Sequence, residues 1–240
     1  MLFRSHSRLE FSDLVGHLSF ANGKMVYQYG PLSLAMKHGG LFLLNELDLL
    51  DPATVSGLNG ILDGDPLCIP ENGGELINPH PMFRFAATAN TNGGSDESGL
   101  YQGTLRQNLA FMDRFWLCEV GYPEKEAESG LLDKIASVLP KSIRDTMVDF
   151  AAEVRQMFMN ANQFGSSIEV TFSTRTLIRW ADLTVRFQPL AHQGIQPVAY
   201  ALDRALGYRA TKETRAMLHE LVQRMFPQSM VFHDEEPVQS

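Results

Sequence analysis

The sequence has 240 residues, enough for one large domain or two small ones at roughly 150 residues per domain. Apolar residues make up 44% of it and charged residues 20%, proportions that exclude a mostly disordered chain. Lysine and arginine number 20 against 28 aspartates and glutamates, a net charge of −8 that argues against general binding to nucleic-acid phosphates.

No apolar run reaches the ~18 to 20 residues that cross a bilayer, so we expect no membrane-spanning segment. The N-terminal residues contain no apolar signal region. The two cysteines, Cys68 and Cys118, lack the spacing of a metal site. These features predict a protein of the reducing cytoplasm.

The first half of the chain has the pattern of an α/β sheet. Short apolar runs bounded by polar residues predict strands at 41–44, 83–88 and 115–120. A helix is expected at 52–62, and two extended runs around Asn72-Gly73 predict a β-hairpin at 67–77. This order indicates an α/β fold with an inserted hairpin.

After residue 122 the pattern becomes helical. Apolar residues recur at steps of three and four along one face, at Ile143, Met147, Phe150, Ala151, Val154 and Phe158. Further helices are predicted from Ser173 or Thr174 to about Phe187, over 197–206 and over 211–225. The tail after Pro227 is expected to fray.

Polar residues follow the first two predicted strands. Asn45, Glu46 and Asp48 come after strand 41–44, and Asn90 comes after strand 83–88. Open α/β sheets bind ligands at the edge where such strands end. Solvated loop acids and Asx-turns at Asn90 and Asn92 are the alternative interpretation of each segment taken alone.

Two arginines are candidates for phosphate contacts. Arg114 precedes strand 115–120 and could reach a neighbouring subunit's phosphates, or simply pair with Asp113 on the surface. Arg175 lies in the first turn of a predicted helix, where a cation opposes the helix dipole, so we expect an acidic or phosphate partner for it. Arg179 is the less favoured alternative.

In combination and in order, these segments resemble the AAA+ ATPases of the MoxR group, in the branch of the cobaltochelatase ATPase subunit. The likeness covers about residues 10 to 185. The matching segments are Asp13-Leu14-Val15-Gly16, Leu44-Asn45-Glu46-Leu47-Asp48, Asn78-Pro79-His80-Pro81-Met82-Phe83-Arg84, Ala87-Thr88-Ala89-Asn90-Thr91, Ser98-Gly99-Leu100-Tyr101-Gln102-Gly103-Thr104, Met112-Asp113-Arg114 and Ser173-Thr174-Arg175-Thr176.

The resemblance implies roles for five residues. Asn45 and Glu46 would close the Walker B strand and hold Mg²⁺, with Glu46 as the base that polarises the attacking water. Asn90 resembles the first sensor, which aligns that water. Arg114 resembles the arginine finger given to the next protomer, and Arg175 resembles the second sensor, which contacts ATP from the lid.

The resemblance also implies an architecture. Residues 1–122 would form a partial AAA+ α/β core, 123–228 a helical lid and 229–240 a flexible tail. Hairpin 67–77 looks like the insertion in the second helix of this group, which usually faces the pore or a partner. The resemblance implies a homo-oligomeric ring, namely a hexamer, and makes a von Willebrand A-type protein a candidate partner.

The sequence departs from the family pattern twice. Gly-x-x-x-x-Gly-Lys-Ser/Thr, the loop whose backbone N–H groups and lysine hold the β- and γ-phosphates, does not occur. The resemblance places that loop ahead of residues 13–16, so we expect that an N-terminal portion is missing; a true loss of nucleotide binding is the rival account. Asn45 also replaces the usual aspartate, which predicts weaker Mg²⁺ binding.

Three functions follow as hypotheses. The first is an ATPase subunit that couples ATP binding and hydrolysis to remodelling of a partner complex, with metal insertion into a tetrapyrrole as one output; this chain alone is expected to be inactive. The second is a nucleotide-blind assembly module. The third, a nucleic-acid translocase, is disfavoured by the net charge of −8 and the lack of a basic stripe.

Overall fold

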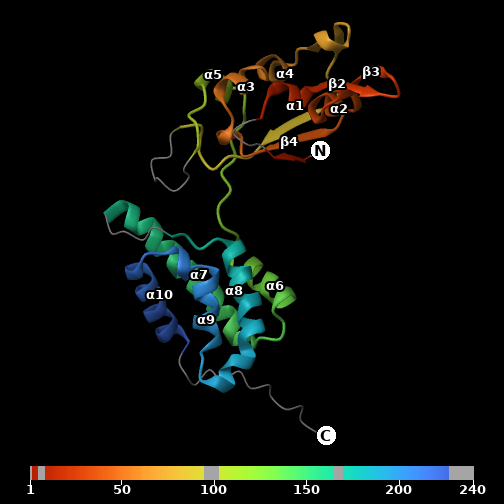
Figure 1. Cartoon of the computed structure of the whole chain (residues 1–240). Helices are drawn as coiled ribbons and strands as arrows, with labels where there is room; N and C mark the ends of the chain where they lie inside the picture. Colours follow the sequence, from red (N-terminus) through yellow and green to blue (C-terminus); the bar gives the residue numbers. More distant parts are fainter. Residues whose placement is uncertain (1, 5–8, 95–102, 165–169, 227–240) are drawn as a thin grey trace. The chain divides into compact units, whose positions relative to one another are not determined.

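The computed structural model describes residues 2–4, 9–94, 103–164 and 170–226 (Figure 1). It consists of two compact units, residues 1–118 and 119–240. Residues 98–102 of the family-like segments and the predicted tail at 229–240 lie outside the described residues. None of the described helices combines the length and apolar character needed to span a bilayer.

A small parallel sheet is the centre of the first unit. Its strands are β1 (Leu2–Arg4), β4 (Leu41–Asn45) and β7 (Arg84–Ala87), in the order β1-β4-β7. The middle strand pairs in parallel with both neighbours, and in β4 the side chains of Phe42 and Leu44 are fully buried. The predictions of an α/β fold and of strands at 41–44 and 83–88 are confirmed.

Short helices cover this sheet: α1 (Phe11–Val15), α2 (Pro31–His38), α3 (Pro52–Ser56), α4 (Asn59–Asp63) and α5 (Leu109–Met112), with 3-10 turns at Leu47–Leu49 and Pro70–Asn72. The predicted helix 52–62 is thus divided into α3 and α4. Asp51 is its N-cap as expected, since Oδ1 accepts the Ala53 N–H at 2.7 Å. Gly57, which ends α3, leaves room for Phe11: a Cβ there would lie 2.9 Å from the Phe11 ring.

Two hairpins extend from the first unit. The predicted one is present, as β5 (Leu67–Ile69) and β6 (Glu75–Ile77). It lies between α4 and β7 and interrupts no helix. The hairpin that does separate two helices is β2 (Gly16–Ala21) with β3 (Lys24–Tyr29), placed between α1 and α2. The interpretation of 67–77 as an insertion within a helix is therefore wrong; β2–β3 occupies such a place.

Glycines allow the β2–β3 hairpin to leave the helices. A Cβ on Gly16 would lie 2.3 Å from the Gln28 oxygen, and one on Gly30 would lie 2.3 Å from the Leu14 oxygen. The Gly30 N–H donates to the Val15 oxygen at 2.7 Å. After the hairpin the chain therefore returns to the C-terminal end of α1. The helical path consequently continues from α1 into α2 across the base of the hairpin.

The predicted strand at 115–120 does not form. Residues 116–120 have no regular secondary structure and are exposed, with Trp116 fully open to solvent. A strand needs a neighbour that satisfies its backbone hydrogen bonds. Within the described residues the sheet ends at β1 and β7, and neither pairs with this segment. Apolar composition alone therefore misled the prediction.

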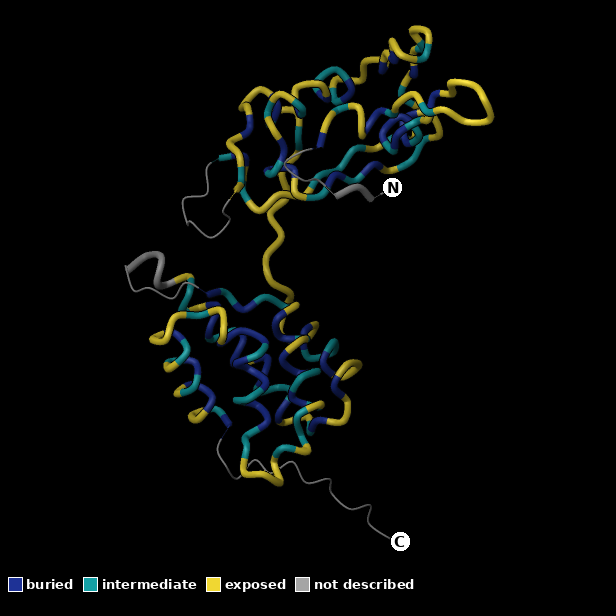
Figure 2. Tube along the Cα trace, in the orientation of Figure 1, coloured by how far each residue is buried: buried dark blue, intermediate teal, exposed yellow. Residues whose placement is uncertain are grey.

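The second unit is a helical bundle made of α6 (Lys125–Ile135), α7 (Lys141–Phe164), α8 (Thr174–Phe187), α9 (Pro197–Ala205) and α10 (Lys212–Met225), with 3-10 turns at Gln188–Gln193 and Gly207–Arg209. Ser173 is the N-cap of α8, because Oγ accepts the Thr176 N–H at 3.1 Å. The predicted apolar face of α7 points inward, with Phe158 only half-buried. Figure 2 shows the buried residues concentrated along the inner faces of these helices.

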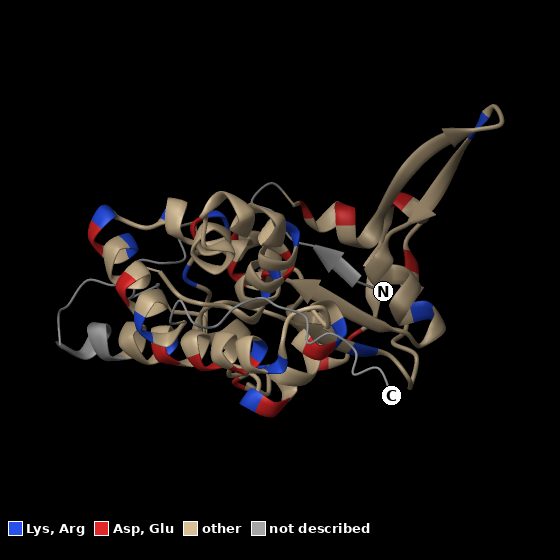
Figure 3. Ribbon diagram, turned by 90° about the horizontal axis from the view of Figure 1, so that it is seen from below, with Lys and Arg blue, Asp and Glu red and all other residues tan. Residues whose placement is uncertain are grey.

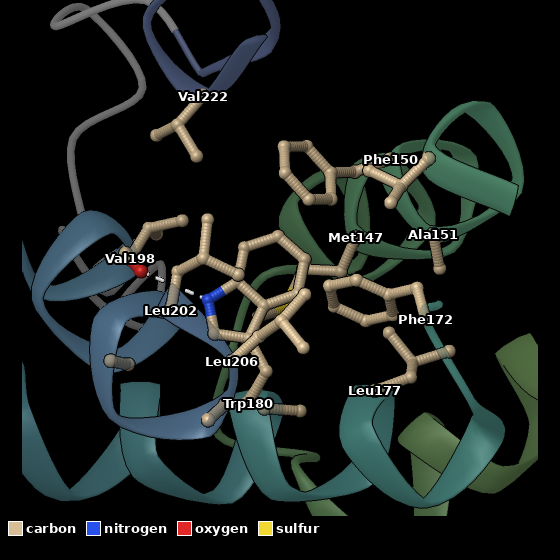
Figure 4. Close-up of a cluster of buried hydrophobic side chains, with 14 of the residues drawn as sticks. Met147, Phe150, Ala151, Phe172, Leu177, Trp180, Val198, Leu202, Leu206 and Val222 are labelled. Atoms are coloured by element: carbon tan, nitrogen blue, oxygen red, sulfur yellow. Dashed lines mark hydrogen bonds between the residues drawn. The ribbon is translucent and has the colours of Figure 1, made fainter. Parts of the chain in front are cut away.

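Trp180 occupies the middle of the bundle core (Figure 4). Its ring is 4.8 Å from that of Phe150 and 5.7 Å from that of Phe172, measured between centroids. The indole N–H donates to the Val198 oxygen at 2.9 Å, so the one polar atom of this large side chain is satisfied. The ring contact of Phe150 with Trp180 thus joins α7 to α8, and the indole hydrogen bond joins α8 to α9.

We predict that Phe150→Ala lowers the free energy of unfolding of the helical unit by about 3–5 kcal/mol, because it leaves a cavity beside Trp180. Guanidinium titration of the full chain in a Trp116→Phe background, followed by Trp180 fluorescence, measures this loss. The matched control is Val138→Ala, at a side chain that is 60% exposed, which should cost less than about 0.5 kcal/mol. A loss below about 1 kcal/mol for Phe150→Ala contradicts the described core.

An acidic centre links α9 to α10. Asp203 is buried, and its carboxylate accepts hydrogen bonds from Arg215 Nη2 at 2.6 Å and Nε at 2.8 Å and contacts His219 Nε2 at 2.8 Å. Burial raises the pKa of Asp203, but hydrogen bonds from Arg215 and His219, with their charges, outweigh it, and the net effect is a lowered pKa. The folded state therefore favours the ionised carboxylate.

Because the folded pKa of Asp203 lies below its unfolded value, its contribution to stability is present above the unfolded pKa and is lost as pH falls towards the folded one. We predict that the helical unit unfolds at lower denaturant as pH is reduced from about 5 to about 3. Asp203→Asn should reduce this dependence, whereas Asp182→Asn, in an exposed pair with Arg186, should not. Equal pH slopes for Asp203→Asn and wild type would refute this assignment.

Candidate functional site

The carboxyl ends of β4 and β7 lie side by side at one edge of the sheet. The parallel register pairs Leu41 with Arg84 and Leu44 with Ala87, so Asn45 and Glu46 leave β4 where Thr88 leaves β7. Open α/β sheets bind ligands at this edge. We call residues 45–48 together with residues 88–91 the polar edge.

Thr88 joins the two chain segments of the polar edge. Its hydroxyl donates to Asn45 Oδ1 at 3.1 Å and accepts the Glu46 N–H at 3.2 Å. Its backbone oxygen accepts the Leu47 N–H at 2.8 Å. One threonine therefore fixes the last residue of β4 and the two residues that follow it, a role that no pattern in the sequence indicated.

Glu46 has a strained backbone. Its φ of 59° and ψ of 48° lie in the left-handed region, which non-glycine residues rarely adopt. Such a conformation costs of order 1–3 kcal/mol and occurs most often at functional sites. The turn leaves Glu46 exposed while Leu47 and Asp48 are buried. The predicted base thus lies at the surface of the sheet edge, available to a ligand.

Asp48 anchors the loop after β7. Its side chain is buried, and Oδ2 accepts the N–H groups of Asn90 at 2.8 Å and of Thr91 at 3.1 Å. Its backbone oxygen accepts the Leu105 N–H at 2.7 Å. A carboxylate that holds two backbone N–H groups makes charge-assisted bonds, which are stronger than neutral ones. Asn90 is consequently held next to the segment that carries Asn45 and Glu46.

The sequence offered a partial signal for Asp48. It is the second acidic residue after a buried strand and belongs to the family-like segment 44–48, but the resemblance implies no role for it. Its partners are 42 and 43 residues away in the chain, so only the fold reveals that the carboxylate faces inward. The structure therefore adds Asp48 and Thr88 to the candidate site as residues that position Glu46 and Asn90.

Arg114 is held by an acidic residue of its own unit. Nε and Nη2 bind Asp63, at the end of α4, at 2.8–3.0 Å. Hydrogen bonds from Arg114 lower the pKa of Asp63 despite some desolvation. Among the residues that the structure describes, no hydrogen bond or ion pair joins the Arg114 side chain to the polar edge, and its role in a neighbouring protomer stays a prediction.

Arg175 lies in the first turn of α8, as predicted, and is exposed. Among the described residues none forms a hydrogen bond or ion pair with its guanidinium, so the acidic partner that the helix dipole suggests is not found there. Because Arg175 belongs to the second unit, its contact with a ligand at the polar edge stays a prediction. Arg179, the alternative, is exposed as well.

The polar edge offers oxygen atoms suited to a hard cation. Its side-chain donors are the Glu46 carboxylate, the Asn45 amide oxygen and the Thr88 hydroxyl. Among the described residues no group of three or more His, Cys, Asp or Glu forms a metal cage. Mg²⁺ commonly takes one or two protein carboxylates and completes its shell with substrate phosphates and water. The residues present therefore fit a Mg²⁺ ion that arrives with a nucleotide.

Two family models match the chain. One, described as an AAA domain of the dynein-related subfamily, matches residues 3–115; the other, described as CbbQ/NirQ/NorQ C-terminal, matches residues 128–225. The first therefore contains the sheet and the polar edge, and the second contains most of the helical bundle.

Three curated proteins are similar to the chain over most of its length. Midasin of Dictyostelium discoideum is 31% identical over 201 residues, covering 82% of this chain and 3% of Midasin. The aerobic cobaltochelatase subunit CobS of Sinorhizobium sp is 28% identical over 223 residues, covering 89% of this chain and 63% of CobS. YojN of Bacillus subtilis is 26% identical over 185 residues, covering 75% of this chain and 57% of YojN. The chain thus spans less than two thirds of each of these relatives.

The parallel sheet with polar strand ends and the helical bundle that follows agree with these matches: the chain carries an AAA-type domain followed by a region of the CbbQ/NirQ/NorQ C-terminal type. This combination of domains, together with the similarity to CobS, is consistent with a MoxR-like AAA+ protein. The resemblance drawn from the sequence is confirmed.

We predict that Asp48→Ala releases the loop after β7, because the N–H groups of Asn90 and Thr91 lose their charged acceptor. Amide exchange at Asn90 and Thr91, followed by NMR, should accelerate by at least about tenfold, since each lost bond to a charged group is worth roughly 1.5–3 kcal/mol. Asp65→Ala, at an exposed position of the same unit, is the control and should leave both amides unchanged. Unaltered exchange at Asn90 and Thr91 in Asp48→Ala would remove Asp48 from this role.

Proposed function

We propose that the chain supplies the catalytic edge of an ATPase that binds Mg-ATP, hydrolyses it and uses the cycle to remodel a partner complex. The observation that carries this proposal is the polar edge, where Thr88 and Asp48 position Glu46 and Asn90 at the ends of adjacent parallel strands. The AAA-type domain makes ATP the expected ligand of that edge.

In the proposed reaction a water oxygen attacks the γ-phosphorus of ATP, and the bond from that phosphorus to the β–γ bridging oxygen breaks to release ADP. Glu46 accepts a hydrogen bond from the water and draws its proton away as the new O–P bond forms. The Asn90 amide orients the same water. A bound Mg²⁺ neutralises phosphate charge. Thr88 and Asp48 keep base and orienting amide at a fixed separation, which is the principal contribution a protein makes to phosphoryl transfer.

Asn45 should weaken, without abolishing, the hold on Mg²⁺. Its amide oxygen is a neutral acceptor and already receives the Thr88 hydroxyl. An aspartate at this place would add a negative charge, to which a divalent cation responds strongly. Glu46 and the phosphates themselves would therefore provide most of the attraction.

Arg114 and Arg175 would complete the site. We propose that Arg114 exchanges Asp63 for the γ-phosphate bound by the next protomer of a ring, which the family suggests is a hexamer. The exchange is feasible because the side chains of Arg114 and Asp63 are both partly exposed, and such pairs contribute little net stability. Arg175, without a partner among the described residues, would contact the phosphate of its own subunit from the lid.

The β2–β3 hairpin is the proposed contact with the remodelled partner. Leu18, Phe20 and Met25 lie on one face of it and are exposed, with Phe20 directly opposite Met25. Lys24 is the one Lys, Arg, Asp or Glu in its two strands, and most of the hairpin is tan in Figure 3. A projecting apolar face suits a protein surface more than a nucleic acid. A von Willebrand A-type protein is the candidate partner, and metal insertion is a candidate output because CobS is a cobaltochelatase subunit.

A second candidate function is that of a ring module that does not bind nucleotide. Two observations favour it: the absence of Gly-x-x-x-x-Gly-Lys-Ser/Thr from the sequence, and Asn45 in place of an acid. Such a module would still supply Arg114 to an active neighbour. ATP bound at the polar edge would in any case need its β- and γ-phosphates held by residues outside these 240.

Calorimetry and phosphate release separate the two candidates. We predict no measurable Mg-ATP binding by the 240-residue chain, and both binding and turnover by a phosphate-loop fusion, in which a designed strand and Gly-x-x-x-x-Gly-Lys-Thr loop precede residue 1. In the fusion Glu46→Gln should keep ATP bound and reduce turnover by about 100-fold or more.

Glu71→Gln, at an exposed residue of the same unit, is the matched control and should turn over normally. Unchanged turnover in Glu46→Gln would exclude Glu46 as the base. A folded fusion that binds no nucleotide would favour the module without nucleotide, and tight binding by the 240-residue chain itself would show that the phosphates are held in another way.

A further inference from the structure

A buried arginine organises the start of α8. Arg155, on α7, has a side chain that is 7% exposed, and it forms a bidentate pair with Glu128 of α6, with Nη1–Oε2 at 2.8 Å and Nη2–Oε1 at 2.7 Å. Its Nε donates to the Phe172 oxygen at 2.6 Å. The guanidinium therefore has partners on α6 and on the chain just ahead of α8.

Glu128 extends the same network to the first residue of α8. Its Oε1 accepts the Thr174 hydroxyl at 2.6 Å, and its side chain is 1% exposed. Burial raises the pKa of Glu128, but hydrogen bonds from Arg155 and Thr174 and the Arg155 charge outweigh it, leaving the pKa lowered and the carboxylate ionised. The helix start is thus held at Phe172 and at Thr174, on both sides of its N-cap.

Tyr122 connects the beginning of the second unit to this network. Its ring lies 4.2 Å from the Arg155 guanidinium carbon, and its hydroxyl lies 2.6 Å from Thr171 Oγ1. A planar guanidinium can stack its face on an aromatic ring while its N–H groups, which point outward in the guanidinium plane, bind a carboxylate. The chain entering the unit and the chain entering α8 therefore meet at one side chain.

Stability alone does not account for this arrangement. A buried ion pair is often no more stable than apolar residues of the same volume, because both charges lose their water. What an ion pair with bidentate geometry adds is a defined orientation. Here the oriented segment is the first turn of α8, which carries the exposed Arg175 directly after Thr174.

We propose that Arg155 is a positioning residue that fixes the first turn of α8, and with it Arg175, relative to the segment that enters the helical unit through Tyr122. The part of this inference that concerns ATP rests on the proposed function. The part that concerns the first turn of α8 does not, and it can be tested on the 240-residue chain.

The test is amide exchange by NMR on the full chain carrying Arg155→Lys. This substitution keeps the positive charge and removes the bidentate geometry of the guanidinium. The amides of Thr176 and Leu177, bonded to Ser173, report on the first turn, and that of Ala181 reports on the middle of α8. We expect exchange at Thr176 and Leu177 to accelerate about tenfold relative to Ala181, as the loss of one charged hydrogen bond allows.

Two further variants keep the test sharp. Thr174→Val removes only the hydroxyl bond to Glu128 and should accelerate the same two amides about threefold. Arg144→Lys, on the same helix and also paired with an acid, Asp133, is the matched control and should leave their ratio to Ala181 unchanged. Equal acceleration along all of α8, or no acceleration at the first turn, would overturn the proposal.

A kinetic arm addresses Arg175. In the phosphate-loop fusion, Arg155→Lys should raise KM for ATP about tenfold with a smaller change in kcat, and should add nothing in an Arg175→Ala background. Full additivity of the two substitutions would overturn the link to Arg175. If the wild-type fusion neither binds nor hydrolyses ATP, the proposed function fails, and the exchange ratio still decides whether Arg155 positions α8.

Discussion

The carboxylate of Asp48, buried against the loop after β7, is the interaction on which the candidate site depends. Pairing of two parallel strands fixes only the positions where the strands end. The segments that follow the strands are left free to diverge. By accepting hydrogen bonds from the N–H groups of Asn90 and Thr91, Asp48 joins the segment after β7 to the segment after β4, just past the end of the sheet. Because the acceptor is a carboxylate, these bonds are stronger than neutral ones.

The strained backbone of Glu46 makes sense in this context. A left-handed residue persists only where its surroundings determine it, and here Thr88 binds the residues on both sides of the turn while Asp48 is held inside. The strain and the buried carboxylate together separate two acids that lie two positions apart in the sequence: Asp48 is a structural anchor, and Glu46 is left exposed at the end of the strand.

Much of the fold was predictable from local patterns. Strands at 41–44 and 83–88 and the capped helix from Ser173 follow from apolar runs and from a cap that acts within three residues. The hairpin at 16–29 was missed although Asn22-Gly23, a two-residue turn typical of hairpins, marks it. The strand expected at 115–120 failed because strand formation depends on a neighbour as well as on composition.

The candidate site divides in the same way. Asn45, Glu46 and Asn90 could be identified because polar residues after buried strands point to one edge of a sheet. The positioning roles of Asp48 and Thr88, and the pairing of Arg114 with Asp63, could not, because each joins residues more than forty positions apart. Which groups touch a ligand therefore stays a prediction from the sequence, whereas the groups that hold them are found only in the structure.

Paramagnetic broadening by Mn²⁺-ATP in the isotope-labelled phosphate-loop fusion tests the central claim most directly, because it locates the metal-bound phosphates relative to named amides. If the nucleotide binds at the polar edge, the amide signals of Glu46 and of residues 88–91 broaden strongly, and those at the hairpin turn of Asn22 and Gly23 persist. Strong broadening elsewhere in the first unit, with Glu46 and residues 88–91 unaffected, would contradict the account.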